Sequence, residues 1–186
     1  APQTGAKEPM GAIPDVATTA EPEWIPWSIR AGKPAQADPR EQHLADLRQL
    51  TFEGENAEAR WSADGKKLIF QATPKGARCD QIFVMDLGSG ETKQVSTGGG
   101  EAAGGSFFPA GDRILYASTR GAGEACPPRP DGSRGDGWTR GDLDVYSAKA
   151  DGSDARPLLA SSGHDAEATA APDGSRLVFN FTVEGY

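Results

Sequence analysis

Trp-Ser-Ala-Asp-Gly-Lys-Lys-Leu-Ile-Phe, residues 61–70, is the first of three similar segments in this chain. The second is Phe107–Tyr116 and the third is Ala170–Phe179. In each segment a glycine-centred turn leads into a short apolar run, which is the pattern of a turn entering a β-strand. The chain is therefore predicted to repeat one unit of β-structure.

The spacing of the repeat indicates the size of that unit. Gly65 and Gly111 are 46 residues apart, and Gly111 and Gly174 are 63 apart. The excess of 17 residues falls in an inserted loop, residues 121–141, which is rich in Gly, Pro and Arg. A period of about 46 residues is typical of four-stranded propeller blades. We therefore predict an all-β fold, an incomplete β-propeller of about two and a half blades.

Alternation of apolar and polar residues predicts where the strands lie. The expected strands are 57–62, 67–72, 81–86 and 92–96 in blade one (57–96), 104–108, 113–118, 144–148 and 156–159 in blade two (104–159), and 167–171 and 176–182 in a partial blade three (165–186). An additional outer strand, 47–51, precedes them and resembles the strand that completes the last blade of a closed ring. Since propellers need roughly 4–8 blades, we expect a fragment, a chain that continues beyond Tyr186, or a partner on the open faces.

The repeated motifs resemble those of the TolB-type propeller family over roughly residues 42–186. The residues that carry the resemblance are Trp61–Phe70, Gln81–Asp86, Asp144–Tyr146, Asp151–Ser153 and Ala171–Arg176. The resemblance implies a periplasmic or secreted protein without enzymatic activity, which acts as a protein-binding scaffold. Similar propellers also precede peptidase domains, so an accessory domain of a longer secreted hydrolase is the alternative. The second repeat departs from the pattern, with Ala110 where Asp is expected and with Gly104 and Gly105 in its first strand.

Residues 1–40 form a separate, proline-rich arm. Seven of the 14 prolines fall here, and each one fixes φ and removes a backbone donor, so an extended conformation is expected. Large apolar side chains on a stiff backbone can bury much area with little loss of freedom. We therefore predict that the arm docks onto a larger, membrane-associated protein assembly. The predicted contact residues are Ile13, Trp24, Ile25, Trp27 and Ile29, with Trp138 of the inserted loop as a further anchor.

Composition and charge restrict the possible partners. The net charge is −8 and the isoelectric point about 4.8, which argues against nucleic acid or an anionic membrane surface as a partner. The chain begins with Ala1 rather than Met, as expected for an exported protein whose signal has been removed, or for a trimmed chain. Cys79 and Cys126 both fall after the second strand of adjacent blades. In an exported protein we therefore expect them to form a disulfide.

Candidate catalytic residues are few. The only histidines are His43 and His164, and no Gly-x-Ser-x-Gly segment occurs. Ser161, Ser162, His164 and Asp165 lie in one short segment, and sequence neighbours rarely adopt the geometry of a catalytic triad. We therefore predict that the protein is not an enzyme.

One acidic position recurs in the repeat. Glu58, Gly104 and Glu167 each lie seven residues before a repeat glycine, at the start of the strand nearest the central channel. Glu58 and Glu167 could contribute oxygen ligands to a Ca²⁺ ion. The alternative is a solvated acidic rim. No other cofactor is expected.

The aromatic residues of the repeat are expected to form the core between blades. These are Trp61, Phe70, Phe83, Phe107, Tyr116, Tyr146 and Phe179.

Overall fold

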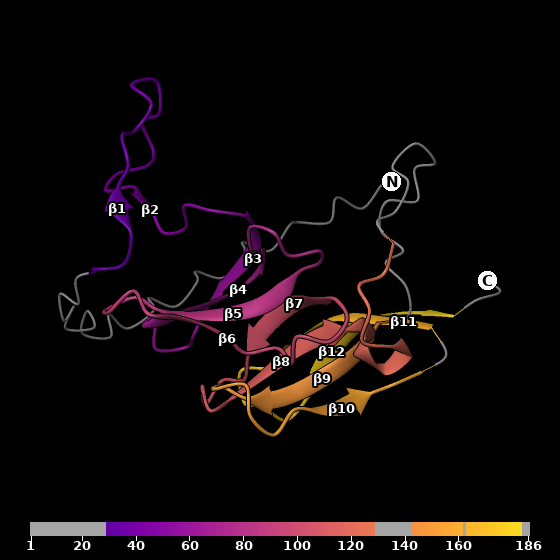
Figure 1. The fold of residues 1–186 in the computed structure, drawn as a ribbon. Coiled ribbons are helices and arrows are strands. Elements are labelled where there is room, and N and C mark those ends of the chain that lie inside the picture. Colours follow the sequence, from indigo (N-terminus) through magenta and orange to yellow (C-terminus); the bar gives the residue numbers. More distant parts are fainter. Residues whose placement is uncertain (1–28, 129–142, 162, 184–186) are drawn as a thin grey trace, which may run out of the picture.

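The computed structural model describes residues 29–128, 143–161 and 163–183 (Figure 1). Within the described residues, a two-stranded sheet is followed along the chain by two four-stranded antiparallel sheets and a second two-stranded sheet. Blade one contains β3 (Glu55–Trp61), β4 (Lys67–Thr73), β5 (Gln81–Asp86) and β6 (Thr92–Gln94). Blade two contains β7 (Ala102–Phe107), β8 (Arg113–Ser118), β9 (Asp144–Lys149) and β10 (Arg156–Leu159), and β11 (Gly163–Ala170) pairs with β12 (Leu177–Val183). The predicted fold class of about two and a half blades is confirmed.

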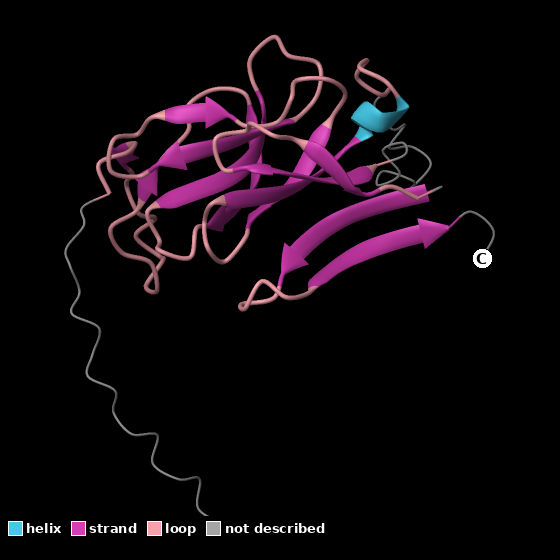
Figure 2. Ribbon diagram, turned by 90° about the horizontal axis from the view of Figure 1, so that it is seen from below, coloured by secondary structure: helices cyan, strands magenta, loops and turns pink. Residues whose placement is uncertain are grey.

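The blades stack face to face, and the central strands are buried on both sides (Figure 2). One apolar core lies between blades one and two and includes Ile69, Ile82, Ile114 and Tyr116. A second core joins blade two to the β11–β12 pair through Leu115, Val145 and Ala168, with Leu177 packed against it. Because each middle strand contributes side chains to two cores, its sequence is an almost continuous apolar run rather than a strict alternation.

The three repeat turns have the same geometry. Gly65, Gly111 and Gly174 have φ values of 68°, 74° and 71°, in the left-handed region that glycine adopts without strain. In each turn the glycine N–H donates to the carbonyl three residues earlier, at 2.8–2.9 Å. The turn therefore depends on the glycine, which explains why Ala110 can replace the preceding aspartate. At Asp173 the carboxylate accepts hydrogen bonds from the N–H and hydroxyl of Ser175, and these lower its pKa.

Gly105 is required by the packing of blade two on blade one. A Cβ at Gly105 would lie 2.9 Å from Cγ2 of Ile82, closer than real Cβ atoms approach, and 3.0 Å from Cγ1 of Ile69, which is tighter than nine in ten real Cβ contacts. The equivalent residue of the next strand pair is Ala168, which is 3% exposed and packs against Leu115 and Val145. Val145 occupies the register position of Ile82. Glycine at position 105 thus lets blade two pack closely on Ile69 and Ile82 of blade one.

The inner strand of every blade contains a β-bulge at the same place. The register shifts between Ala57 and Arg60 in β3, between Ala103 and Ser106 in β7, and between Ala166 and Thr169 in β11. The bulge residues are Glu58, Gly104 and Glu167, with φ values of 53°, 64° and 53°. In the G1 type of β-bulge, the first residue has a left-handed backbone conformation and is usually glycine. Two of the three bulges therefore hold a glutamate in a conformation that costs roughly 1 kcal/mol or more.

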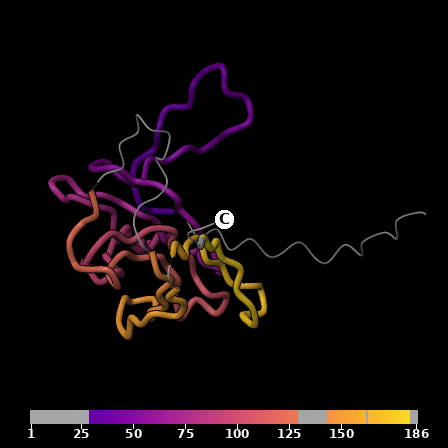
Figure 3. Tube along the Cα trace, turned by 90° about the vertical axis from the view of Figure 1, so that its right-hand side faces the viewer, coloured from indigo at the N-terminus to yellow at the C-terminus, as the bar shows by residue number. Residues whose placement is uncertain are grey.

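The segment before blade one folds back onto its outer face. The N–H groups of Arg30 and Ala31 donate to the Leu87 carbonyl at 3.0 and 3.1 Å, and Arg48 Nε donates to the Ala31 carbonyl at 3.0 Å. Ala31 is buried in a cluster with Leu68, Phe70, Ala72, Met85 and Leu87. The short strands β1 (Lys33–Pro34) and β2 (Arg48–Gln49) pair with each other, and the loop between them projects from the body (Figure 3).

This arrangement differs from one expectation. Residues 29–31 were expected in the extended arm, yet they lie against blade one. The physical reason is that blade one has an apolar outer face, and the nearest chain segment covers it. Residues 47–51 resemble the strand that completes the last blade of a closed ring, and this role stays a prediction, because the described residues contain no last blade and β2 there pairs with β1. A short 3₁₀ helix, Thr119–Ala122, opens the inserted loop and was not expected from sequence. No helix among the described residues is long and apolar enough to cross a lipid bilayer.

Tyr116 gives the fold a testable dependence on alkaline pH. Its ring stacks on Tyr146 with centroids 5.8 Å apart, and its hydroxyl has no hydrogen-bond partner among the described residues. Burial raises the pKa of Tyr116 to about 12. Because the unfolded chain loses this proton near pH 10, the stabilisation is complete below pH 10 and declines as the pH rises towards 12.

We expect wild-type protein to lose about 1.4 kcal/mol of unfolding free energy between pH 9 and pH 11 through Tyr116 alone. The variant Tyr116→Phe lacks this titration and should lose correspondingly less. Urea unfolding of both proteins at the two pH values measures the difference. Tyr146 also has a raised pKa, and its contribution is common to both proteins. An identical loss in wild type and variant would contradict the assignment.

Candidate functional site

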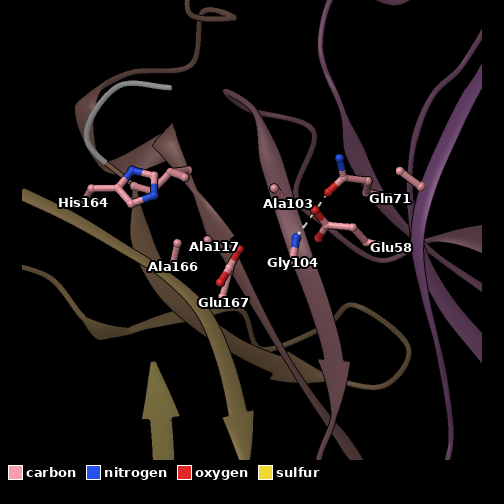
Figure 4. Close-up of a pocket in the computed structure, with 10 residues that line it drawn as sticks. Glu58, Gln71, Ala103, Gly104, Ala117, His164, Ala166 and Glu167 are labelled. Carbon is pink, nitrogen blue, oxygen red and sulfur yellow. Dashed lines mark hydrogen bonds between the residues drawn. The ribbon is translucent and has the colours of Figure 1, made fainter. Parts of the chain in front are cut away.

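The inner strands of the three sheets line a cavity of about 290 Å³ (Figure 4). Its wall includes the three bulge residues Glu58, Gly104 and Glu167, together with Gln71 and His164. Gln71 connects two blades, because its Oε1 accepts a hydrogen bond from the Gly104 N–H at 3.3 Å while its Nε2 donates to Asp80 at 2.9 Å. The predicted alignment of Glu58, Gly104 and Glu167 beside the channel is therefore reproduced by the inner strands.

The cavity does not provide an evident metal centre. The Glu167 carboxylate accepts a hydrogen bond from the side-chain amide of Asn180, which occupies one of its oxygens. No group of three or more His, Cys, Asp or Glu side chains in the described part of the chain could hold a metal ion. Calcium binding by Glu58 and Glu167 stays a prediction.

The Ser161–His164–Asp165 segment has a structural explanation. Asp165 is 1% exposed, and its carboxylate accepts hydrogen bonds from the Ser161 N–H and hydroxyl, each at 3.0 Å. Its own N–H donates to the Leu143 carbonyl at 2.8 Å. A catalytic relay would place the histidine between serine and aspartate, whereas here the serine bonds directly to the carboxylate. These contacts fasten β11 to blade two.

Several exposed apolar side chains lie on the first and last strand pairs of the blade stack. Trp61 in β3 is 56% exposed, although the residues at its repeat position, Phe107 and Ala170, pack into the cores between blades. At the other end, Val178 is 64%, Phe179 38% and Phe181 55% exposed. The expectation that Trp61 and Phe179 belong to the core between blades is therefore wrong within the described structure. Each lacks the neighbouring strand or blade that buries its counterparts.

The structure describes only one of the six predicted partner contacts. Ile29 packs against the Ala31–Leu87 cluster of its own blade one. The other five, Ile13, Trp24, Ile25, Trp27 and Trp138, lie outside the described residues. Sequence reasoning missed Val178 and Phe181 as exposed positions. Counting strands in the third repeat could have identified them, because a blade with only two strands leaves its second strand at an edge.

Cys79 and Cys126 form a disulfide with a Cα–Cα distance of 5.7 Å. Cys79 follows β4 of blade one, and Cys126 follows the 3₁₀ helix after β8 of blade two. The bond therefore connects adjacent blades on one face of the stack, as the placement of both cysteines after second strands had suggested.

Stacked four-stranded antiparallel sheets with their first strands at a common channel define an incomplete β-propeller. The chain is similar to a putative TolB from Agrobacterium tumefaciens, at 22% identity and a TM-score of 0.53, over 69% of this chain and 40% of that one. It is also similar to TolB from Acinetobacter baumannii, at 21% identity and a TM-score of 0.55, over 73% of this chain and 29% of that one. A structure from a study of two prolyl endopeptidases matches at 17% identity with a TM-score of 0.48.

The fold is thus a TolB-like propeller, as the repeat motifs implied. The chain spans less than half the length of the solved chains that it matches. No protein-family model and no curated protein sequence matches it.

Proposed function

We propose that the protein is a non-enzymatic, exported scaffold that binds other proteins, as a peripheral periplasmic subunit of a membrane-associated complex. One observation carries the proposal: the described sheets have the fold of the TolB structures that they match.

Two further features support export and a protein partner. The disulfide between Cys79 and Cys126 suits an oxidising compartment such as the periplasm. The net charge of −8 suits a protein partner better than nucleic acid or an anionic membrane surface. The TolB-like fold is compatible with this role. In the proposal, the proline-rich arm contributes its own contacts through Trp24 and Trp27.

The arm can be tested separately from the body. Deleting residues 1–28 retains Ile29 and Ala31, which pack on blade one, so the melting temperature should not change. Recovery of the membrane-associated partner with tagged protein from a cell-envelope extract, quantified by mass spectrometry, should fall by at least about ten-fold, which corresponds to 1.4 kcal/mol. A matched full-length variant, Trp24→Ser with Trp27→Ser, should show most of the same loss. Undiminished recovery with both proteins would contradict a role for the arm.

A further inference from the structure

A groove follows the seam between blades one and two, at the strand ends opposite the disulfide. One hollow, of about 400 Å³, lies between the two repeat turns, with Ser62 and Asp64 on one side and Pro109 and Ala110 on the other. A second hollow, of about 450 Å³, lies between the β5–β6 turn and the turn after β9. Lys67 lines both hollows, so they adjoin. The groove is therefore formed by two blades that each have four paired strands.

The floor of the larger hollow is apolar and held firmly. Val84 and Val95 line the hollow and are buried in the core between the two blades. Ala150 of blade two packs against the same core. The Lys93 ammonium donates to the Asp151 carbonyl at 2.8 Å, which ties the two blades together across the seam. A ligand in the groove would thus meet a preformed apolar surface.

In blade two, the matching charged side chains bind each other. Arg113 begins β8 as Lys67 begins β4, and by strand register Asp154 corresponds to Glu91. Arg113 Nη1 donates to Asp154 Oδ2 at 3.2 Å, and Arg113 Nε donates to Ser147 Oγ at 3.1 Å. Lys67 and Glu91 both line the larger hollow but form no ion pair within the described part of the chain. The groove thus presents charges that blade two neutralises internally.

Three aspartates around the groove are held in place by their own turns. One carboxylate oxygen of each accepts hydrogen bonds from a nearby serine, which is Ser62 for Asp64, Ser89 for Asp86 and Ser153 for Asp151. These bonds lower the pKa of each carboxyl, so all three are ionised at neutral pH. The second oxygen of each carboxylate accepts no hydrogen bond from the described residues, which leaves it available to a cation.

The balance of charge favours a basic occupant. Four carboxylates line the groove, those of the three aspartates and of Glu91, and they outnumber the two ammonium groups of Lys67 and Lys93. Lys67 also lies opposite Asp86 in the strand register, so its charge is partly compensated. The whole chain carries a net charge of −8, which attracts a basic partner from a distance.

We propose that the groove between blades one and two binds an extended, basic segment of a partner protein. Arginine or lysine side chains of the segment pair with Asp86 and Glu91, and its apolar side chains lie on the floor that Val84 and Val95 form. Two adjoining hollows suit an extended segment better than a compact ligand. This inference rests on the proposed scaffold function and gives it a surface that is separate from the arm.

A fluorescein-labelled hexapeptide of alternating arginine and valine is the probe. Fluorescence anisotropy with the full 186-residue chain, at about 0.15 M salt, should show saturable binding. The groove variant, Asp86→Asn with Glu91→Gln, should bind at least about ten-fold more weakly, because two charges that face the arginines are lost. Asparagine at position 86 keeps an oxygen that can accept the hydrogen bonds of Ser89, so the turn is retained.

The matched control, Glu53→Gln with Asp173→Asn, makes the same change in net charge outside the groove. Asp173 has the same turn chemistry as Asp86, since it accepts hydrogen bonds from Ser175. The control should bind the peptide within about two-fold of wild type. Circular dichroism and thermal melting establish that each variant is folded. Absence of saturable binding to wild type, or an equal loss in both variants, overturns the inference, because binding would then follow overall charge.

Amide chemical shifts give the location of the peptide. Its addition should shift residues 86–93 of the β5–β6 turn, whereas shifts confined to Glu58, Glu167 and their channel neighbours would overturn the inference. Failure of the groove is distinguishable from failure of the scaffold function. If a partner is recovered from the cell envelope but the peptide does not bind, the groove alone is rejected. If the peptide binds but no envelope partner is recovered, the scaffold function alone is rejected.

Discussion

Removing the disulfide, by replacing Cys79 and Cys126 together with serine, is expected to lower the unfolding free energy by roughly 4 kcal/mol. The bond joins residues 47 positions apart, and the closed loop contains β5 to β8 of blades one and two. Losing it restores freedom to the unfolded chain, which is the main source of stabilisation by a long disulfide loop. Chemical unfolding at equilibrium measures the change through the denaturation midpoint.

The control for this prediction is a reducing agent. Wild-type protein unfolded in the presence of a reductant should approach the double serine variant, and the variant itself should not respond. If native protein under oxidising conditions is alkylated at both cysteines, the bond and the predicted stabilisation are both contradicted.

Gly105→Ala is expected to cost about 1–3 kcal/mol, because the added methyl group overlaps Ile69 and Ile82 in a fully buried core. The atom nearest to the added methyl is Cγ2 of Ile82, which alanine at position 82 lacks. The double variant Gly105→Ala with Ile82→Ala should therefore lose less stability than the sum of the two single losses.

The measurement is a double-mutant cycle of unfolding free energies. Ile82→Ala alone should cost about 2–5 kcal/mol, the usual effect of truncating a buried isoleucine to alanine. The coupling between the two positions should favour the double variant by at least about 0.5 kcal/mol. Strict additivity would show that Gly105 does not owe its small size to Ile82.

The central strands could be predicted from sequence because their signals are local. A glycine turn followed by an apolar run places β4, β8 and β12 within a residue of their observed bounds. The turn geometry also follows from Gly65, Gly111 and Gly174 alone. Repetition then supplied the sheet order, since the same turn must connect the same two strands in each blade.

The remainder depends on contacts between distant residues. β1 and β2 contain two residues each, one of them Pro34, so they carry no periodic pattern, and their position depends on the apolar outer face of blade one. The left-handed conformation of Glu58 and Glu167 follows from register shifts in their strands, and no local sequence pattern predicts these shifts. Trp61 and Phe179 were assigned to a core because aromatic residues usually belong there. They are exposed because the described residues include no neighbouring strand or blade that would bury them.

The blades form a stack that is held together by the buried central strands β4 and β8, each paired on both sides. Residue-resolved hydrogen exchange tests this most directly. We expect slow exchange throughout β4 and β8, and fast exchange in the loop between β1 and β2, which projects from the body. Fast exchange along β4 or β8 would contradict the stacked-blade structure.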